Sequence, residues 1–300
     1  METGWPPLPI DAWAETRDTL HMWSQIVGKV RLALAPMINH WWQATFYVNA
    51  SGYTTSLIPW RDGGFEMVFN FQRHVLSVTT VDGKARELPL ESRSVSDFYR
   101  ELFDVLRGLG IEVEILARPV EVEVAIPFAE DTVHATYDPL AAAAFWRSLV
   151  SSHRVLTEFR SRFIGKASPV HLFWGGLDLA VTRFSGRTAP RHPGGVPNCA
   201  DWVQELAYSH EVSSCGYWPN GADEGIFYSY AYPTPDGFRD APLAPDAAYF
   251  DESMGEFVLP YAAVRQAADP DAYLLSFLQS TYEAAANLAA WDREALEVKG

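Results

Sequence analysis

A carboxylate in the middle of an apolar run is the feature of this sequence that most suggests chemistry. Asp178 follows Leu177 and precedes Leu179, Ala180 and Val181. Burying a carboxylate without a partner is very costly, so Asp178 must either pair with a cation or open onto a cavity. Both interpretations place a polar group where the pattern otherwise predicts a buried strand.

The two interpretations of Asp178 imply different partners. In the structural one, the carboxylate forms an ion pair with Arg183, Arg187 or Lys166. In the functional one, it is a general base or a ligand anchor with a shifted pKa, because perturbed carboxyls gather at functional sites. The sequence leaves both open.

Side chains around Asp178 are divided between two faces of a strand predicted over residues 171–184. Trp174 and Asp178 point to one face, whereas His171 and Arg183 point to the other. A site that combines Asp178 with His171 therefore needs a bulge, or a contribution from another segment.

Acid/base chemistry is the reaction type that these groups suggest. Asp178 would be the base, a histidine its partner, and Lys166 with Arg183 would anchor an anionic group. The catalytic candidates are Asp178, His171 and His210, and the substrate-binding candidates are Lys166, Arg183, Trp174, Glu211 and Tyr228.

Two later strands are expected to contribute to the same cavity. Over residues 205–215, Glu211 shares its face with Ser213 and Cys215, and this face is too polar for a core. We expect it to border solvent or a wet cavity. Tyr228 belongs to a set of alternating tyrosines over residues 226–232, whose phenols would line that cavity.

Lys29 and Lys166 each follow a glycine at a predicted helix end. There they would interact favourably with the last carbonyl groups of the helix. The alternative is a lysine that forms an imine or binds a carboxylate, which would need an apolar pocket such as Trp41, Trp42 and Trp174 provide.

Other chemistries have little support. A zinc site would have to combine His40, His171 and His210 with an acidic residue, yet no HExxH motif or cysteine pair is present, so we expect no metal. Cys215 lacks the helix N-terminus or cation that activates a thiol. No glycine-rich phosphate loop occurs, so we expect no nucleotide cofactor, and no cofactor of any kind.

Composition limits the partners. The chain of 300 residues carries a formal charge of −15, and apolar residues make up 48% of it. Nucleic acids and anionic membranes need a basic face, so neither is expected. Two cysteines, no visible signal peptide and no long apolar segment make the cytoplasm the expected location. A small molecule or a second copy of the chain remains as partner.

Helical and alternating patterns predict the elements that position these residues. Together they indicate an α+β fold with antiparallel sheet covered by long helices. The predicted helices span residues 13–34, 94–109, 138–163 and 272–291. The predicted strands span 40–50, 65–71, 74–81, 111–117, 120–126, 171–184, 205–215 and 226–232.

The chain is expected to form a single domain over residues 1–300, and two stretches of it share an order of signals. In residues 11–127 and again in 138–291, a helix leads to Gly-Lys, a proline and a strand beginning with His and Trp or Phe. The spacings differ, because eleven residues separate Lys29 from His40 and five separate Lys166 from His171. Duplication of two related halves is therefore one interpretation, and common helix-to-strand connections are the other.

Five longer motifs resemble a bacterial family known only as a domain of unknown function. The resemblance covers nearly the whole chain and implies one family-wide domain, but it carries no activity, cofactor or catalytic assignment. The motifs are WPPLP at 5–9, LHMWSQIVGK at 20–29, NHWW at 39–42, FIGKASPVH at 163–171 and YSHE at 208–211.

Three functional hypotheses follow. The first is a cofactor-independent enzyme that uses acid/base chemistry on a small anionic or aromatic substrate. The second is a non-catalytic protein that binds a small molecule on its Trp and Tyr surface. The third is an interaction protein whose aromatic face joins two subunits. Whether the chain is an enzyme is open at this point.

Overall fold

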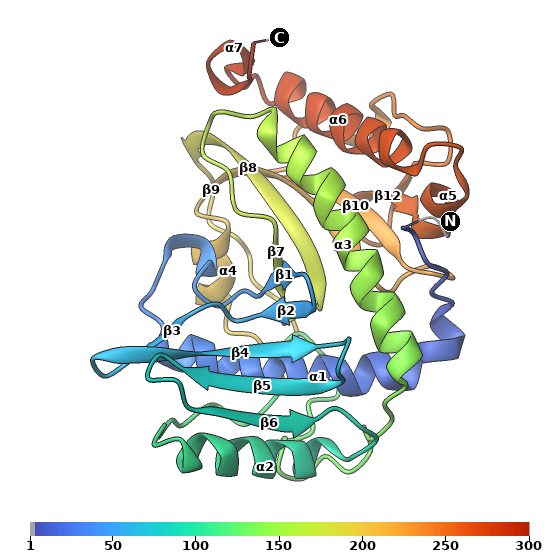
Figure 1. The fold of residues 1–300 in the computed structure, drawn as a ribbon. Coiled ribbons are helices and arrows are strands. Elements are labelled where there is room, and N and C mark those ends of the chain that lie inside the picture. The colour runs from blue at the N-terminus through green and yellow to red at the C-terminus, as the bar shows by residue number, and fades with distance from the viewer. Residues whose placement is uncertain (1–3, 300) are drawn as a thin grey trace.

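Two antiparallel sheets with helices packed against them form the protein, whose computed structural model describes residues 4–299 (Figure 1). The predicted α+β fold is confirmed. The first sheet has the order β1 (Tyr47–Asn49), β2 (Gly52–Thr54), β4 (Gly63–Asn70), β5 (Val75–Thr80) and β6 (Ala85–Pro89), and β3 (Ile58–Trp60) pairs with β4. The second has the order β11 (Tyr249–Asp251), β12 (Glu256–Pro260), β10 (Ile226–Tyr232), β9 (His210–Trp218), β8 (Asp178–Thr188) and β7 (His171–Phe173).

Long helices cover the sheets. α1 (Ile10–Leu34) and α2 (Val95–Gly108) pack on the first sheet and on each other, and α3 (Pro139–Ser161) and α6 (Pro270–Leu288) pack on one face of the second sheet (Figure 1). The shorter helices are η1 (Asn39–Trp41), α4 (Asp201–Ala207), η2 (Phe238–Asp240), α5 (Tyr261–Gln266) and α7 (Arg293–Leu296). Among residues 4–299, no helix combines the length and apolarity needed to cross a membrane.

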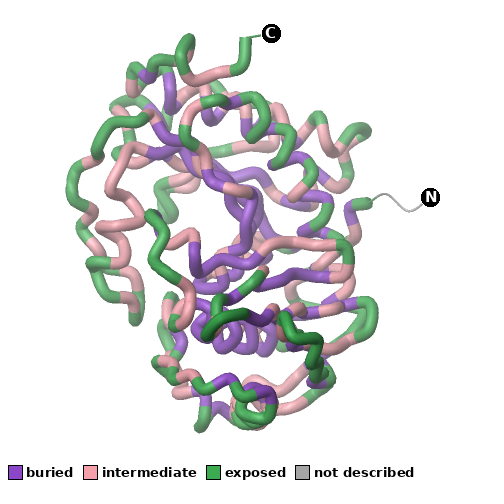
Figure 2. The backbone as a smooth tube through the Cα atoms, turned by 60° about the vertical axis from the view of Figure 1, so that its left-hand side comes forward, coloured by how far each residue is buried: buried purple, intermediate pink, exposed green. Residues whose placement is uncertain are grey.

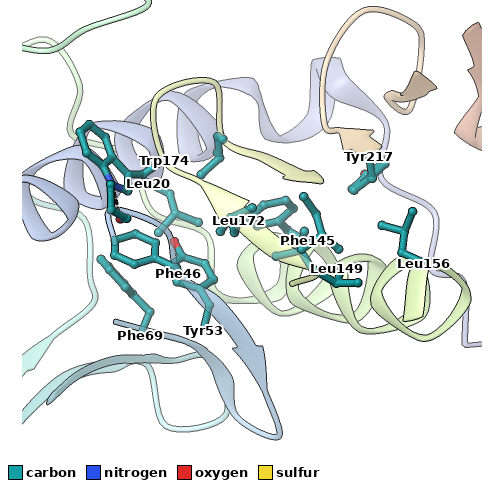
Figure 3. Close-up of a cluster of buried hydrophobic side chains, with 14 of the residues drawn as sticks. Leu20, Phe46, Tyr53, Phe69, Phe145, Leu149, Leu156, Leu172, Trp174 and Tyr217 are labelled. Atoms are coloured by element: carbon teal, nitrogen blue, oxygen red, sulfur yellow. Dashed lines mark hydrogen bonds between the residues drawn. The ribbon is translucent and has the colours of Figure 1, made fainter. Parts of the chain in front are cut away.

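One hydrophobic cluster joins the two sheets (Figure 3). Phe46 and Tyr53 stack at 5.5 Å between ring centroids beside the first sheet, and Leu172 of β7 packs in the same cluster. Backbone hydrogen bonds link Phe46 to Leu172 in both directions. The two stretches that repeat an order of signals thus share a core.

Several sequence predictions are confirmed at the level of individual caps. The Ser94 side chain accepts a hydrogen bond from the backbone N–H of Asp97 at the start of α2. Asp138 caps α3 in the same way, with Pro139 in the first turn. The strand predicted over residues 226–232 coincides with β10.

Two predicted strands are wrong because local backbone geometry interrupts them. Residues 171–184 form a hairpin, in which β7 and β8 are joined through Gly175, Gly176 and Leu177, the last with φ 58°. Residues 40–50 begin in η1, where His40 and Trp41 have φ values of 57° and 64°, so only β1 is a strand there.

Three further strand predictions are corrected. Residues 111–117 and 120–126 form no strand, because this extended segment is bound by single hydrogen bonds to other loops and to α1 rather than by a neighbouring strand. Residues 205–215 begin in α4 and become β9 only at His210. The alternating pattern in the sequence extends from β9 back into the last residues of α4, so it does not mark where the helix ends.

Candidate functional site

A cavity of about 560 Å³ lies between the second sheet and α1, in the position expected for an aromatic pocket. One face of β8, β9 and β10 forms its floor. Its other walls are the inner side of α1, η1, residues 114–121 and the segment that leads into α4. Buried residues, purple in Figure 2, gather in the sheet and helices, whereas the covering residues 189–207 contain none.

The floor follows from strand alternation and from the register of three strands. Thr182 of β8 lies opposite Ser214 of β9, which in turn lies opposite Tyr230 of β10. The floor residues are Asp178, Ala180, Thr182, Phe184, Val212, Ser214, Tyr228 and Tyr230.

The stripe of Ser213 and Cys215, expected to border a wet cavity, lies on the other face of β9. Both side chains are buried beneath the helices, where the Cys215 thiol contacts the carbonyl oxygen of Val181. The expectation for this stripe is therefore wrong, because small polar side chains fit beneath packed helices. Among the polar side chains of β9, the one that reaches the cavity is Ser214.

Asp178 has a phenol as its partner. The Tyr228 hydroxyl donates a hydrogen bond of 2.5 Å to Oδ2 of Asp178. Burial raises the pKa of Asp178 to about 6, although this hydrogen bond lowers it. Gly216 makes the pairing possible, since a Cβ at this position would overlap the Tyr228 hydroxyl. Within residues 4–299 no cation pairs with Asp178, so the predicted ion pair with Arg183, Arg187 or Lys166 is wrong.

Glu121 is a second carboxyl in the cavity, and sequence reasoning missed it. It was part of an alternating segment interpreted as a strand, but its backbone adopts φ 60° and its carboxylate lies against Gly175. By surface area Glu121 is an exposed residue, because its side chain borders the open cavity, although many protein atoms lie around its carboxylate. Burial, and then the charge of Asp178, raise the pKa of Glu121 to about 7.

The hairpin turn between β7 and β8 fits these two carboxyls. A Cβ on Gly175 would overlap the Glu121 carboxylate, and one on Gly176 would lie 3.0 Å from Oδ1 of Asp178. Side chains at either position would displace an acidic group. The glycine pair is therefore explained by the space that the carboxylates occupy.

Side chains of α1 hold that turn in place. The ring nitrogen Nε2 of His21 lies 2.7 Å from the carbonyl oxygen of Gly175. Gln25 binds both backbone groups of Val120, donating to its carbonyl at 2.8 Å and accepting from its N–H at 2.9 Å. The motif at 20–29 thus positions both the turn and the segment that carries Glu121.

The last two residues of the motif, Gly28 and Lys29, face Trp174. A Cβ on Gly28 would overlap the indole of Trp174, which lies beside α1 (Figure 3) and donates a hydrogen bond of 2.6 Å to the carbonyl of Ala44. Lys29 lies inside α1, five residues before its end at Leu34, so its predicted role as a helix cap is wrong. Its amine lies 5.6 Å from the Trp174 ring centroid.

Lys29 is the basic group of the cavity wall, and its side chain is only 5% exposed. Burial lowers the pKa of this amine to about 8, whereas Cys199 and Glu121 act in the opposite direction. Its amine forms no hydrogen bond or ion pair with any residue in the described range. The sequence signal for this site was the Gly-Lys pair within a helical pattern.

Aromatic side chains make up much of the remaining wall. Trp41 and Trp202 pack at 5.2 Å between ring centroids, and Trp41 also donates a hydrogen bond to the carbonyl of Val203. The hydroxyls of Tyr208 and Tyr230 are hydrogen-bonded at 2.9 Å. The aromatic lining residues are Trp41, Trp42, Phe173, Trp174, Phe184, Trp202, Tyr208, Tyr228 and Tyr230.

Of the predicted site residues, the structure brings together Asp178, Trp174 and Tyr228. The two histidines do not join them. His171 is fully buried, neither ring nitrogen has a hydrogen-bond partner in the part of the chain that the structure describes, and burial lowers its pKa to about 3. His210 begins β9 and lies 5.8 Å from the His40 ring, not among the residues that line the cavity.

The remaining candidates also lie outside the cavity wall. Arg183 points to the opposite face of β8, where its guanidinium lies 3.5 Å from the Phe159 ring centroid. The Lys166 amine is 2.7 Å from Nε2 of His40. Glu211 forms an ion pair of 2.7 Å with Arg187. The predicted anchors for an anion therefore do not face Asp178.

A metal-binding cluster is also absent from the described part of the chain. Among residues 4–299, no three His, Cys, Asp or Glu side chains come close enough together to hold an ion. The chemistry that this arrangement supports comes from carboxyl, phenol and amine groups in an aromatic cavity.

Replacing Glu121 with glutamine is expected to change how stability depends on pH. The folded state holds the proton of Glu121 up to a pKa of about 7, above the ordinary value of 4.5. Wild type therefore loses stability from this group as pH rises from 4.5 to 7, and the variant does not. After allowance for solvent, we expect the variant to gain about 1 kcal/mol relative to wild type between pH 4.5 and 8. Urea unfolding at both pH values measures it, and an unchanged difference would contradict the raised pKa of this carboxyl.

The chain belongs to the family of unknown function DUF5996, whose model matches residues 5–298. The resemblance noted from the motifs is thereby confirmed. No curated protein and no solved structure matches the chain. The family carries no assigned activity, so the site's geometry is the basis for a function.

Proposed function

We propose that this protein is an enzyme that takes a small, largely apolar molecule into the cavity and transfers a proton on it, with Asp178 as the acid/base group. The observation that carries this proposal is the Asp178 carboxyl in an aromatic cavity, bound to the Tyr228 phenol and to no cation within residues 4–299. Such a carboxyl changes protonation state near neutral pH, where a general base is most useful.

Glu121 supplies the complementary group. Two carboxyls that repel each other in one cavity do not ionise together, so one is a base while the other still holds a proton. The pKa values of about 6 for Asp178 and about 7 for Glu121 favour that division near pH 6.5. An acid and a base are therefore available in the same cavity without a cofactor.

The cavity supports an apolar or aromatic substrate more than an anionic one. Indole, phenyl and phenol rings form most of its wall, and its volume of about 560 Å³ suits a small organic molecule. Among the described residues of that wall, Lys29 is the one lysine or arginine, whereas Glu114, Glu121 and Asp178 are acidic. The acidic composition and the two unpaired cysteines are consistent with action in the cytoplasm.

A variant with a filled cavity tests the proposal. Ser214→Trp places an indole on the cavity floor, and Ser161→Trp makes the same change at an exposed position at the end of α3. We expect wild type and Ser161→Trp to bind members of a panel of small cyclic compounds in ligand-observed NMR, and to exchange their acidic C–H protons into D₂O. Ser214→Trp should do neither. Equal binding and exchange by both variants would overturn the proposal.

A further inference from the structure

Lys29 has the surroundings of a reactive amine and takes no part in the acid/base pair described above. It projects from the interior of α1, between the buried residues Gly28 and Val30, so the helix backbone fixes its position. The side chain lies beside the Trp174 indole, and its amine reaches the cavity. Within residues 4–299 the amine has no carboxylate partner, so an ion pair does not explain why this lysine is buried.

The surroundings of Lys29 favour its neutral form. A neutral amine carries the lone pair needed for attack on carbon, and an apolar pocket is the usual way to obtain one near neutral pH. Lowering the pKa from 10.5 to about 8 increases the neutral fraction at pH 7 roughly three-hundredfold. The nearby Glu121 carboxyl can move protons to and from the group that reacts.

We propose that Lys29 forms an imine with a carbonyl group of the molecule held in the cavity, so that the substrates are small aldehydes or ketones with an apolar body. This inference rests on the proposed acid/base function and names its substrate class. The geometry behind it is an amine with no hydrogen-bond or ion-pair partner among the described residues, beside an indole, in a cavity that also contains Glu121 and Asp178.

The reaction balances without an oxidant or a further reactant. The Lys29 nitrogen bonds to the carbonyl carbon, the carbonyl oxygen takes a proton from Glu121, and the nitrogen returns one proton to that carboxylate. A second proton from Glu121 then removes the hydroxyl as water, while the nitrogen lone pair forms the carbon–nitrogen double bond. Amine and carbonyl thus become a protonated imine and water.

The imine explains why a base lies in the same cavity. A protonated imine withdraws electrons from the neighbouring carbon, so that a C–H bond next to it becomes acidic. Asp178 would accept that proton, and the electron pair of the broken C–H bond would form an enamine. Return of a proton from Asp178 to the enamine carbon would restore the protonated imine, and hydrolysis by the reverse of the steps above would release the product and the amine.

The other lysines provide internal controls. Lys84 and Lys299 lie at the surface, where they form ion pairs with Asp82 and Glu294. Lys166 is exposed, and its amine contacts His40 rather than the cavity. The lysines of the sequence are Lys29, Lys84, Lys166 and Lys299, so modification is easily assigned to one position.

Reductive trapping tests the inference directly. Folded wild type is incubated at pH 7 with benzaldehyde or cyclohexanone and sodium cyanoborohydride, and the modified peptides are identified by mass spectrometry. We expect Lys29 to be modified at least about ten times faster than Lys84 and Lys299, since more of its amine is neutral. Ser214→Trp should suppress modification of Lys29 alone, and Ser161→Trp should not. Modification of Lys29 at or below the rate of Lys84 would overturn the inference.

A second readout separates this inference from the proposed function. If Lys29 is not trapped while wild type still exchanges C–H protons of the same ketone through Asp178, the imine is excluded and acid/base catalysis stands. If Lys29 is trapped but Asp178→Asn exchanges protons as fast as wild type, the imine stands and the role of Asp178 fails.

Discussion

Asp178→Asn is expected to exchange the C–H protons of a cavity-bound ketone about 10²–10⁴ times more slowly than wild type, which is the usual contribution of a general base. Asparagine has the shape of aspartate and can still accept the Tyr228 hydrogen bond. It cannot accept a proton at neutral pH. The cavity should therefore bind the ketone with similar affinity, and the rate of deuterium incorporation in D₂O should fall.

Asp62→Asn is the matched control, since Asp62 is exposed and far along the chain from the cavity floor. It should exchange protons at the wild-type rate. A loss of binding in Asp178→Asn that accounts for the whole rate effect would show a ligand anchor instead of a base. An unchanged rate would contradict any catalytic role for this carboxyl.

Gly28→Ala is expected to lower the free energy of unfolding by about 2 kcal/mol, although alanine is the better helix former. Alanine in place of glycine within a helix normally stabilises by about 1 kcal/mol. Here the added Cβ would overlap three atoms of the Trp174 indole, and overpacking of this kind costs about 1–3 kcal/mol. Displacing Trp174 would also break its hydrogen bond to Ala44. Thermal and urea unfolding measure the loss.

Gly108→Ala provides the comparison for this effect. Gly108 ends α2, and a Cβ there would meet nothing within 4 Å, so helix propensity acts alone. This variant should be as stable as wild type or slightly more stable. If Gly28→Ala were stabilising to the same degree, Trp174 would not be packed against α1 in the way described.

The sequence predicted one part of the site correctly, because strand alternation is a short-range property. Trp174 and Asp178 were expected on one face, and Tyr228 on a later strand facing the same cavity, and all three line it. For Tyr228 the alternation held, because the strand predicted over residues 226–232 coincides with β10. Trp174 and Asp178 share the cavity for another reason: the turn reverses the chain and pairs Phe173 with Asp178, so Trp174 reaches the cavity from the turn and not along a continuous strand.

The rest depended on long-range contacts that no local pattern contains. Glu121 reaches the cavity through a left-handed backbone and the space above Gly175, and neither is visible in an alternating run of glutamate and valine. Lys29 looked like a helix cap because Gly28 resembles a helix end, whereas Gly28 accommodates Trp174, which is distant in sequence.

Arg183, in contrast, was predicted to belong to the site but lies outside the cavity. It was considered as an anion anchor although its odd spacing from Asp178 already predicted the opposite face of the strand, and the structure confirms that face. Its guanidinium packs between Phe159 and Tyr282 beneath the helices, at 3.5 and 4.2 Å from their ring centroids. Burial lowers the pKa of Arg183 to about 10.

The titration of the Asp178 carboxyl carbon by NMR tests the central claim most directly, since it needs no substrate. A desolvated carboxyl that faces the cavity and is bound only to a phenol should titrate near pH 6, above the ordinary value of 3.8. In Tyr228→Phe the midpoint should rise further, because the hydrogen bond that stabilises the carboxylate is lost. A wild-type midpoint close to 3.8 would contradict the account, since a carboxyl in an ordinary aqueous environment could not serve as the base proposed for this cavity.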